Sequence, residues 1–120
     1  MSVTIYGIKN CDTMKKARAW LDGRGVEFRF ADYRVEGVDP KRLAAWRDTL
    51  GWEALLNRAS TTWRQLPDAD KAGIDEDKAT ALMLANPTLI KRPVLDVDGR
   101  FTVGFAPDLY DKAVVGVPRS

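Results

Sequence analysis

The side chains that most often carry redox and hydrolytic chemistry are scarce in this sequence. Its 120 residues contain one cysteine, Cys11, and no histidine. A single chain therefore cannot form an internal disulfide, a Cys/His zinc site, a Cys–His dyad or a Ser–His–Asp triad, and we expect no metal site. Any thiol chemistry at Cys11 needs a second thiol from another molecule.

Long apolar runs and a strong charge imbalance are also missing. No apolar stretch approaches the roughly 20 residues that cross a membrane, and no secretion signal precedes the first expected strand. With the unpaired cysteine, this leads us to expect a cytoplasmic protein. The net charge of +2 arises from 19 basic and 17 acidic residues that are interspersed, so we expect neither direct nucleic-acid binding nor membrane contact. The length predicts one domain, residues 1–120.

Cys11 lies between an expected strand and an expected helix. Residues 3–6 favour a strand, Gly7 and Asn10 interrupt it, and Asp12 or Thr13 can cap the helix that follows. The inner face of this helix is expected to consist of Met14, Ala17, Trp20 and Leu21. The sulfur is therefore predicted to lie at a helix N-terminus.

That position favours the thiolate, because unpaired backbone N–H groups and the helix dipole stabilise an anion. Lys15 and Lys16 add positive charge one turn further along. Cations in a first turn oppose the dipole, which suggests that something anionic compensates them. The alternative is that Cys11 is a small buried apolar side chain and that the lysines form a solvated surface.

The remaining elements follow from turn and capping signals. A turn at 23–25 leads to a half-buried strand at 26–31, which completes a strand–helix–strand unit. Asp39-Pro40 opens a helix that ends at Gly51. Further helices are expected at 52–56, at 60–66 with Ser60 or Thr61 as its cap, and at 76–86 after Asp75, with an exposed acidic loop at 67–73 between the last two.

The C-terminal part predicts a hairpin and a helix. Residues 93–97 and 100–103 are joined by Asp98-Gly99, which suits a type I′ turn because both positions need positive φ. Pro107 opens a last helix, and residues 114–120 are expected to be a loose tail. This order predicts an α/β thioredoxin-like fold with a helical insertion at about 40–86. In that fold a proline opening the third strand faces the cysteine. Pro93 is the candidate, unless it is an ordinary proline at a strand end.

Several segments spread over the chain resemble a known family. They are Tyr6-Gly-Ile-Lys-Asn-Cys-Asp-Thr-Met-Lys-Lys-Ala17, Arg18-Ala-Trp-Leu21, Leu55-Leu-Asn-Arg58, Thr61-Thr-Trp-Arg64 and Leu89-Ile-Lys-Arg-Pro93. Together they resemble the ArsC-like thioredoxin-fold family, which comprises ArsC-type arsenate reductases, Spx-type transcriptional regulators and the YffB-like group, and they are most similar to the last. The resemblance implies a glutathione-using thiol reductase with Cys11 as nucleophile and Arg92 and Pro93 beside it.

Two departures from the family patterns bear on function. Spx-type proteins typically carry a second cysteine where this sequence has Met14, so a CxxC switch is impossible here. ArsC-type reductases are similar to one another in having three arginines around the anion. In this sequence Arg92 matches the first, Arg58 is shifted relative to the second, and residues 103–106, the region of the third, contain no arginine. Arsenate reduction is therefore the alternative rather than the first expectation.

With one cysteine, the simplest cycle passes through a mixed disulfide that free glutathione resolves. Glutathione is then a co-substrate rather than a bound cofactor, and the partners are a small-molecule or protein disulfide. Its carboxylates suit Lys15, Lys16 and Arg92, and Asn10, Thr13, Arg58 and Pro93 complete the predicted binding residues.

Other roles for these residues remain open. Arg92 could instead pair with Asp96, and Arg58 and Arg64 either shape the site or cap and solvate the insertion. The competing function is a non-enzymatic, Spx-like regulator that binds partners through its helical insertion. We expect a monomer in either case.

Overall fold

A computed structural model describes residues 2–9 and 11–117. The chain divides into two compact units, Met1–Glu36 with Arg92–Ser120, here called the sheet unit, and Gly37–Lys91, here called the helical unit. Within the described ranges, no helix is long and apolar enough to cross a lipid bilayer. Each unit has its own buried residues.

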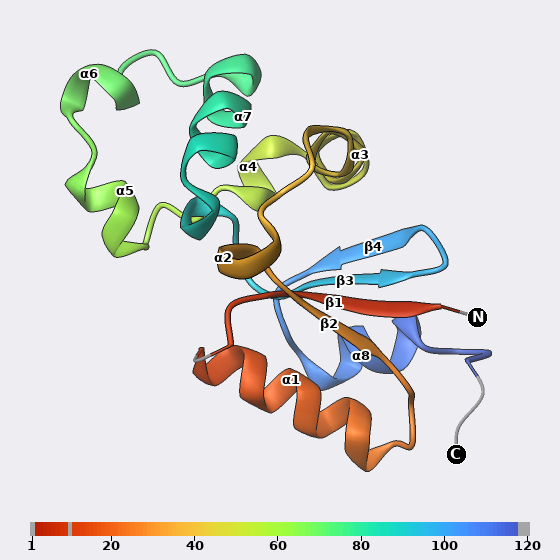
Figure 1. The fold of residues 1–120 in the computed structure, drawn as a ribbon. Coiled ribbons are helices and arrows are strands. Elements are labelled where there is room, and N and C mark those ends of the chain that lie inside the picture. The colour runs from red at the N-terminus through yellow and green to blue at the C-terminus, as the bar shows by residue number, and fades with distance from the viewer. Residues whose placement is uncertain (1, 10, 118–120) are drawn as a thin grey trace. The chain divides into compact units, whose positions relative to one another are not determined.

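The sheet unit is built on a mixed sheet of four strands in the order β2-β1-β3-β4 (Figure 1). The strands are β1 (Val3–Gly7), β2 (Arg29–Asp32), β3 (Val94–Val97) and β4 (Arg100–Val103). β1 runs parallel to β2 and antiparallel to β3, and β3 is antiparallel to β4. The predicted thioredoxin-like fold is confirmed.

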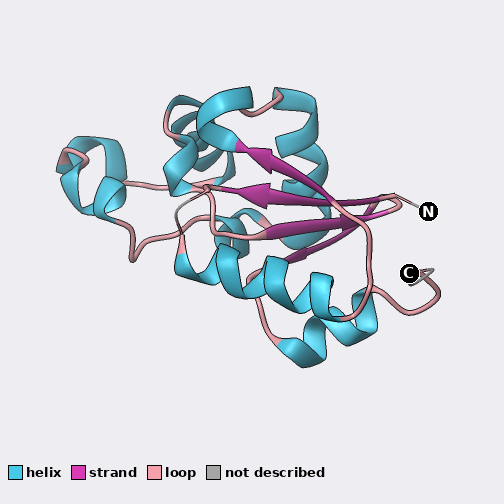
Figure 2. Ribbon diagram, turned by 60° about the horizontal axis from the view of Figure 1, so that its bottom comes forward, coloured by secondary structure: helices cyan, strands magenta, loops and turns pink. Residues whose placement is uncertain are grey.

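Helices α1 (Asp12–Gly23) and α8 (Pro107–Ala113) lie on one face of this sheet, and the short α2 (Tyr33–Glu36) follows β2 (Figures 1 and 2). The alternate residues of the strands that point to α1 and α8 form the core with them. This core consists of Val3, Ile5, Met14, Ala17, Leu21, Val26, Leu95, Val97, Tyr110, Val114 and Val117. The chain passes from β1 through α1 to β2, which is the crossover of a parallel strand pair. The residues after β1 therefore lie at the carboxyl end of this pair.

Three local predictions in the sheet unit were wrong. α1 begins at Asp12 with Cys11 itself as the N-cap, not Asp12 or Thr13. The second strand starts at Arg29 rather than at 26, because the Val26 N–H donates to the Leu21 carbonyl at 3.0 Å and closes the helix end. The expected loose tail is packed as far as Val117, since the side chains of Val114 and Val117 enter the core. Its last residues, 118–120, lie outside the described residues.

The hairpin was predicted correctly. Asp98 and Gly99 connect β3 to β4, and both have positive φ, 52° and 85°. The register pairs Val97 with Arg100, directly flanking the turn. A two-residue turn of this hand matches the twist of the strands it joins.

The helical unit contains α3 (Pro40–Leu50), α4 (Trp52–Leu55), α5 (Thr61–Gln65), α6 (Asp68–Lys71), α7 (Glu76–Ala85) and the 3₁₀ turn η1 (Pro87–Leu89). Asp39, Ser60 and Asp75 are N-caps, as the sequence predicted. The expected acidic loop at 67–73 contains α6. Asp68 and Asp70 favour that turn because carboxylates stabilise the start of a helix. The buried residues of the unit are Leu43, Trp46, Leu55, Leu56, Ala79, Met83, Leu89 and Ile90.

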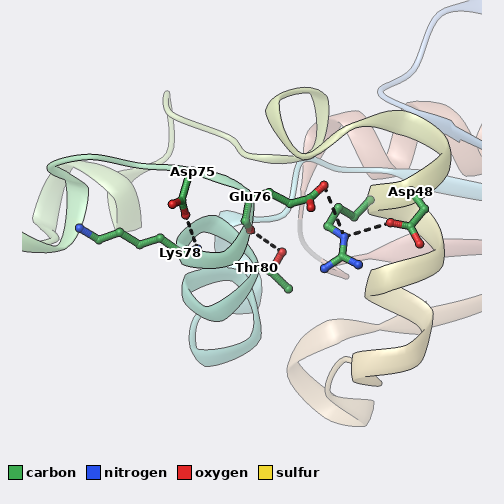
Figure 3. A network of polar contacts seen from close by, with 6 residues as sticks. Asp48, Asp75, Glu76, Lys78 and Thr80 are labelled. Carbon is green, nitrogen blue, oxygen red and sulfur yellow. Dashed lines mark hydrogen bonds and ion pairs between the residues drawn. The ribbon is translucent and has the colours of Figure 1, made fainter.

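Arg47 joins α3 to α7 by charge. Its Nε lies 3.2 Å from the Asp48 carboxylate and 3.8 Å from that of Glu76. Figure 3 shows Asp48 and Glu76 on the two helices, with Asp75 accepting the Lys78 N–H at the start of α7. The α7 N-terminus is thus held by a side-chain cap and by an ion pair to α3.

Candidate active site

Cys11 occupies the N-cap of α1, with extended backbone angles of φ −93° and ψ 130°. Its side chain is half-buried and its thiol is free. An N-cap side chain lies within reach of the N–H groups of the second and third helical residues, which here are Thr13 and Met14. Both N–H groups are oriented so that they act on the sulfur and favour its thiolate.

The surroundings of Cys11 favour its thiolate. Partial burial raises the pKa of the thiol, but the Met14 N–H, the Arg92 guanidinium and the Thr13 N–H together outweigh it, so the pKa lies below that of an ordinary cysteine. Among the described residues, Arg92 is the charged side chain that lowers this pKa. Lys15 and Lys16 are exposed one turn along α1.

Arg92 reaches Cys11 from the segment that precedes β3. Its side chain is half-buried and hydrogen-bonds the sulfur. Asp96, the alternative partner suggested by the sequence, accepts the Gly99 N–H at 2.7 Å within the hairpin. The guanidinium can therefore supply both a donor and a positive charge to an anionic sulfur.

Pro93 is buried at the start of β3, and the Arg92–Pro93 peptide bond is cis. Its carbonyl accepts the Gly104 N–H at 2.9 Å, across from the end of β4. The Pro93 carbonyl is thus engaged within the sheet unit. Because proline has no backbone N–H, Pro93 adds no hydrogen-bond donor next to Arg92.

Tyr33, which the sequence analysis did not single out, lies near Arg92. Its side chain is 2% exposed. Burial raises the pKa of its phenol strongly, while Arg92 acts in the opposite direction and Tyr6 adds to the rise. Tyr33 is therefore a neutral phenol beside the arginine. The apolar alternation of the second strand, continued by two residues from Ala31, was the signal that could have identified Tyr33 as buried.

The other predicted site residues lie in several places. Thr13 is half-buried in the first turn of α1, and Lys15 lines a shallow groove formed by α1 and the segment that contains β2. The remaining lining residues of this groove are Arg18, Ala19, Asp22, Phe28 and Phe30. Asn10 falls outside the described residues.

Arg58 belongs to the helical unit and is exposed there. Its guanidinium lies 5.9 Å from the ring centre of Trp52 and 5.8 Å from that of Trp63. Arg64, in the same unit, donates to the Ala59 carbonyl at 2.9 Å. Within their unit, Arg58 packs on aromatic rings and Arg64 caps a turn.

Comparison with known proteins gives consistent matches over nearly the whole chain. The model of the ArsC family matches residues 6–113. The chain is similar to the solved structure of YffB, with 54% identity, a TM-score of 0.90 and coverage of 93% of this chain and 98% of the other. It is 44% identical over 111 residues to an uncharacterized protein of Haemophilus influenzae, covering 92% of this chain and 97% of that one. It is 26% identical over 111 residues to the global transcriptional regulator Spx of Listeria innocua, covering 88% and 82%.

Proposed function

This chain belongs to the ArsC family, and we propose that it is a glutathione-dependent thiol reductase with Cys11 as its single nucleophile. The observation that carries the proposal is the half-buried Cys11 thiol, whose pKa is lowered by Arg92 and by two helix-terminal N–H groups. A lowered pKa increases the fraction of thiolate at neutral pH. It also makes Cys11 a better leaving group in the second step of the cycle.

The cycle consists of two thiol–disulfide exchanges. The Cys11 thiolate attacks the glutathionyl sulfur of a mixed disulfide RS–SG, forms Cys11–S–SG, and releases RS⁻, which takes up a proton. A glutathione thiolate then attacks the glutathione sulfur of Cys11–S–SG, so that oxidised glutathione leaves and the Cys11 thiolate is regenerated. Each cycle consumes one free glutathione: RS–SG and GSH become RSH and oxidised glutathione, in which one half comes from the substrate and the other from the incoming glutathione. No protein base is required.

Glutathione is anionic, which suits the basic groups near the nucleophile. Arg92 and Lys15 act as countercharges to its carboxylates, and Thr13 and Pro93 line its path. Asn10 and Arg58 complete the proposed binding residues. Since resolution needs reduced glutathione, the protein works in a reducing compartment such as the cytoplasm. The proposed cycle uses one Cys11 at a time, which a monomer can supply.

Intact-mass spectrometry after incubation with oxidised glutathione tests the proposal. We expect one glutathionyl adduct on the wild type and none on Cys11→Ser. Arg92→Ala should slow adduct formation severalfold, and more at low salt than at high salt, because screened electrostatics are part of the lost interaction.

Arg100→Ala is the matched control, because Arg100 lies on β4 in the same unit, and its Nε donates to the Val97 carbonyl at 3.4 Å. It should react like the wild type. An unmodified Cys11 that nevertheless reacts readily with a neutral alkylating reagent would refute the glutathione assignment. Arsenate turnover with glutathione and glutaredoxin should stay near background, and turnover that Cys11→Ser abolishes would make arsenate reduction the better assignment.

The likeness to Spx favours one second candidate, a non-enzymatic partner of another protein. Such a partner should be retained by Cys11→Ser in a pull-down from lysate. Partners held by a mixed disulfide should be lost from the same variant and released from the wild type by a reductant. Partners that all survive the substitution would favour the binding role over the reductase.

A further inference from the structure

The peptide groups of Lys9, two residues before Cys11, are held from both sides by charged side chains. The Lys9 N–H donates to Oδ2 of Asp32 at 3.1 Å. The Lys9 carbonyl accepts from Nη2 of Arg18 at 3.3 Å. Hydrogen bonds between a charged group and backbone are about twice as strong as neutral ones.

Both of these side chains are themselves fixed to β2. Asp32 is the last residue of that strand, and its second oxygen accepts the Arg34 N–H at 2.8 Å. Arg18 lies on α1, and its guanidinium stacks 4.7 Å from the ring centre of Phe30, a β2 residue. Lys9 is therefore tied to the strand that pairs with β1 rather than only to its own chain neighbours.

The restraint on Lys9 extends to the nucleophile. The Cys11 N–H donates to the carbonyl of Ile8 at 3.4 Å, and Ile8 is buried. The Cys11 carbonyl then accepts the Lys15 N–H at 3.0 Å as the first hydrogen bond of α1. The restraints at Ile8 and Lys9 thus act three and two residues before the Cys11 N-cap.

We propose that Asp32 and Arg18 are positioning residues that clamp Lys9 and thereby hold the Cys11 sulfur within reach of the Thr13 and Met14 N–H groups and of Arg92. The inference deepens the proposed function, since it rests on Cys11 being the reactive thiol. Among the described contacts, neither Asp32 nor Arg18 bonds the Cys11 sulfur. They act through the backbone of Lys9.

The sign of the effect separates positioning from simple electrostatics. The groups that act on the Cys11 thiol are the Met14 and Thr13 N–H groups from α1 and Arg92 from the segment before β3, with Tyr33 beside that arginine. Removing the negative charge of Asp32 would by itself favour the thiolate. Loss of the clamp should have the opposite effect, because the sulfur then moves away from its donors.

The test measures the pH of half-ionisation of Cys11 by alkylation rate, and the hydrogen exchange of the Lys9 amide, in Asp32→Ala and Arg18→Ala. Each variant should raise the half-ionisation pH by about half a unit, an upward shift that loss of the Asp32 charge alone would not give. Exchange at Lys9 should accelerate about tenfold in Asp32→Ala, which removes the acceptor of that N–H.

Arg24→Ala is the matched control. Arg24 follows the same helix, stacks 4.6 Å from the ring centre of Trp20 and pairs with Asp111 at 3.0 Å, so it carries the same kinds of contact as Arg18 without bonding Lys9. It should leave both readouts at the wild-type values. Asp32→Asn and Arg18→Lys, which keep one acceptor and one donor, should fall between the wild type and the alanine variants.

Loss of the Arg18 charge would by itself disfavour the thiolate, so Asp32→Ala is the deciding variant. A half-ionisation pH that stays constant or falls in Asp32→Ala, with melting showing it folded, would overturn the positioning role. If an alanine variant does not fold, the milder Asp32→Asn and Arg18→Lys decide by the same criterion. Neither readout involves glutathione. Failure of the wild type to form a glutathionyl adduct would therefore refute the reductase while leaving the clamp to be judged on its own measurements.

Discussion

At the scale of single residues, the ionisation of Cys11 links the site to folding stability. Its pKa is lowered in the folded protein, so the thiolate stabilises the native state. This contribution is fully present above the unfolded-state pKa of about 8.5 and is lost as the pH falls through the lowered folded value. The melting temperature of the wild type relative to Cys11→Ala should therefore rise between weakly acidic and alkaline pH.

Thermal melts of both proteins across that pH range measure this contribution. A difference that stays flat, or that falls with increasing pH, would contradict a stabilised thiolate.

Lys15→Glu, in contrast to Arg92→Ala, should change the half-ionisation pH of Cys11 only slightly, because Lys15 is exposed.

Gly7, the last residue of β1, makes room for the first turn of α1. A Cβ at this position would overlap Sδ of Met14 and lie 2.7 Å from its Cε, and Met14 is fully buried in the core. Gly7→Ala should therefore destabilise the protein by about 1–3 kcal/mol through overpacking. Because the Met14 N–H is among the groups that lower the pKa of Cys11, the half-ionisation pH of Cys11 should rise as well.

Denaturant unfolding of Gly7→Ala, Met14→Ala and the double variant tests this packing. The two losses should add up to more than the loss in the double variant, since the shorter side chain leaves space for the new methyl group. Simple additivity would show that position 7 does not act through Met14.

At the scale of elements, the hairpin between β3 and β4 depends on backbone conformation rather than on contacts. Gly99 has φ +85° and no heavy atom lies within 4 Å of a Cβ built there. Gly99→Ala should cost about 1–2 kcal/mol, because L residues are strained at positive φ. Gly23→Ala, at the end of α1 with equally open space and no positive φ, should instead stabilise by about 0.5–1 kcal/mol.

Denaturant midpoints of the two variants measure both effects. The same residue change with opposite signs at two sites isolates φ as the cause. Two losses of equal size would point to a general intolerance of glycine replacement instead.

At the scale of the whole molecule, the number of unfolding transitions depends on whether the helical unit and the sheet unit unfold together. Met83 in the helical unit and Leu95 in the sheet unit are both fully buried. We propose that the chain of 120 residues behaves as one cooperative domain. Met83→Ala and Leu95→Ala should then each lower the stability by about 2–5 kcal/mol and shift one common transition.

Calorimetry together with hydrogen exchange in each unit distinguishes the outcomes. Under the proposal, amides of both units lose protection in both variants. A separate transition for Gly37–Lys91, shifted by Met83→Ala but not by Leu95→Ala, would show that the units unfold independently.

Features that depend on neighbours in sequence could be read from the chain alone. Asp39 and Asp75 cap helices, Asp98-Gly99 forms the hairpin turn, and Cys11 lies at a helix N-terminus, because capping and turn geometry involve only residues a few positions apart. The same local reasoning placed the cap of α1 one or two residues late, since it could not weigh Cys11 itself as the cap.

What only the tertiary structure decided are the contacts between distant segments. The family resemblance implied that Arg92 lies beside Cys11, but the bonds of Asp32 and Arg18 with Lys9 join the end of β2 and α1 to the segment before Cys11, and no motif predicted them. They depend on which strands pair and in which register, and no sequence spacing encodes that choice. The single cysteine thus determined that any thiol cycle needs an outside partner, while strand pairing determined which groups surround the sulfur.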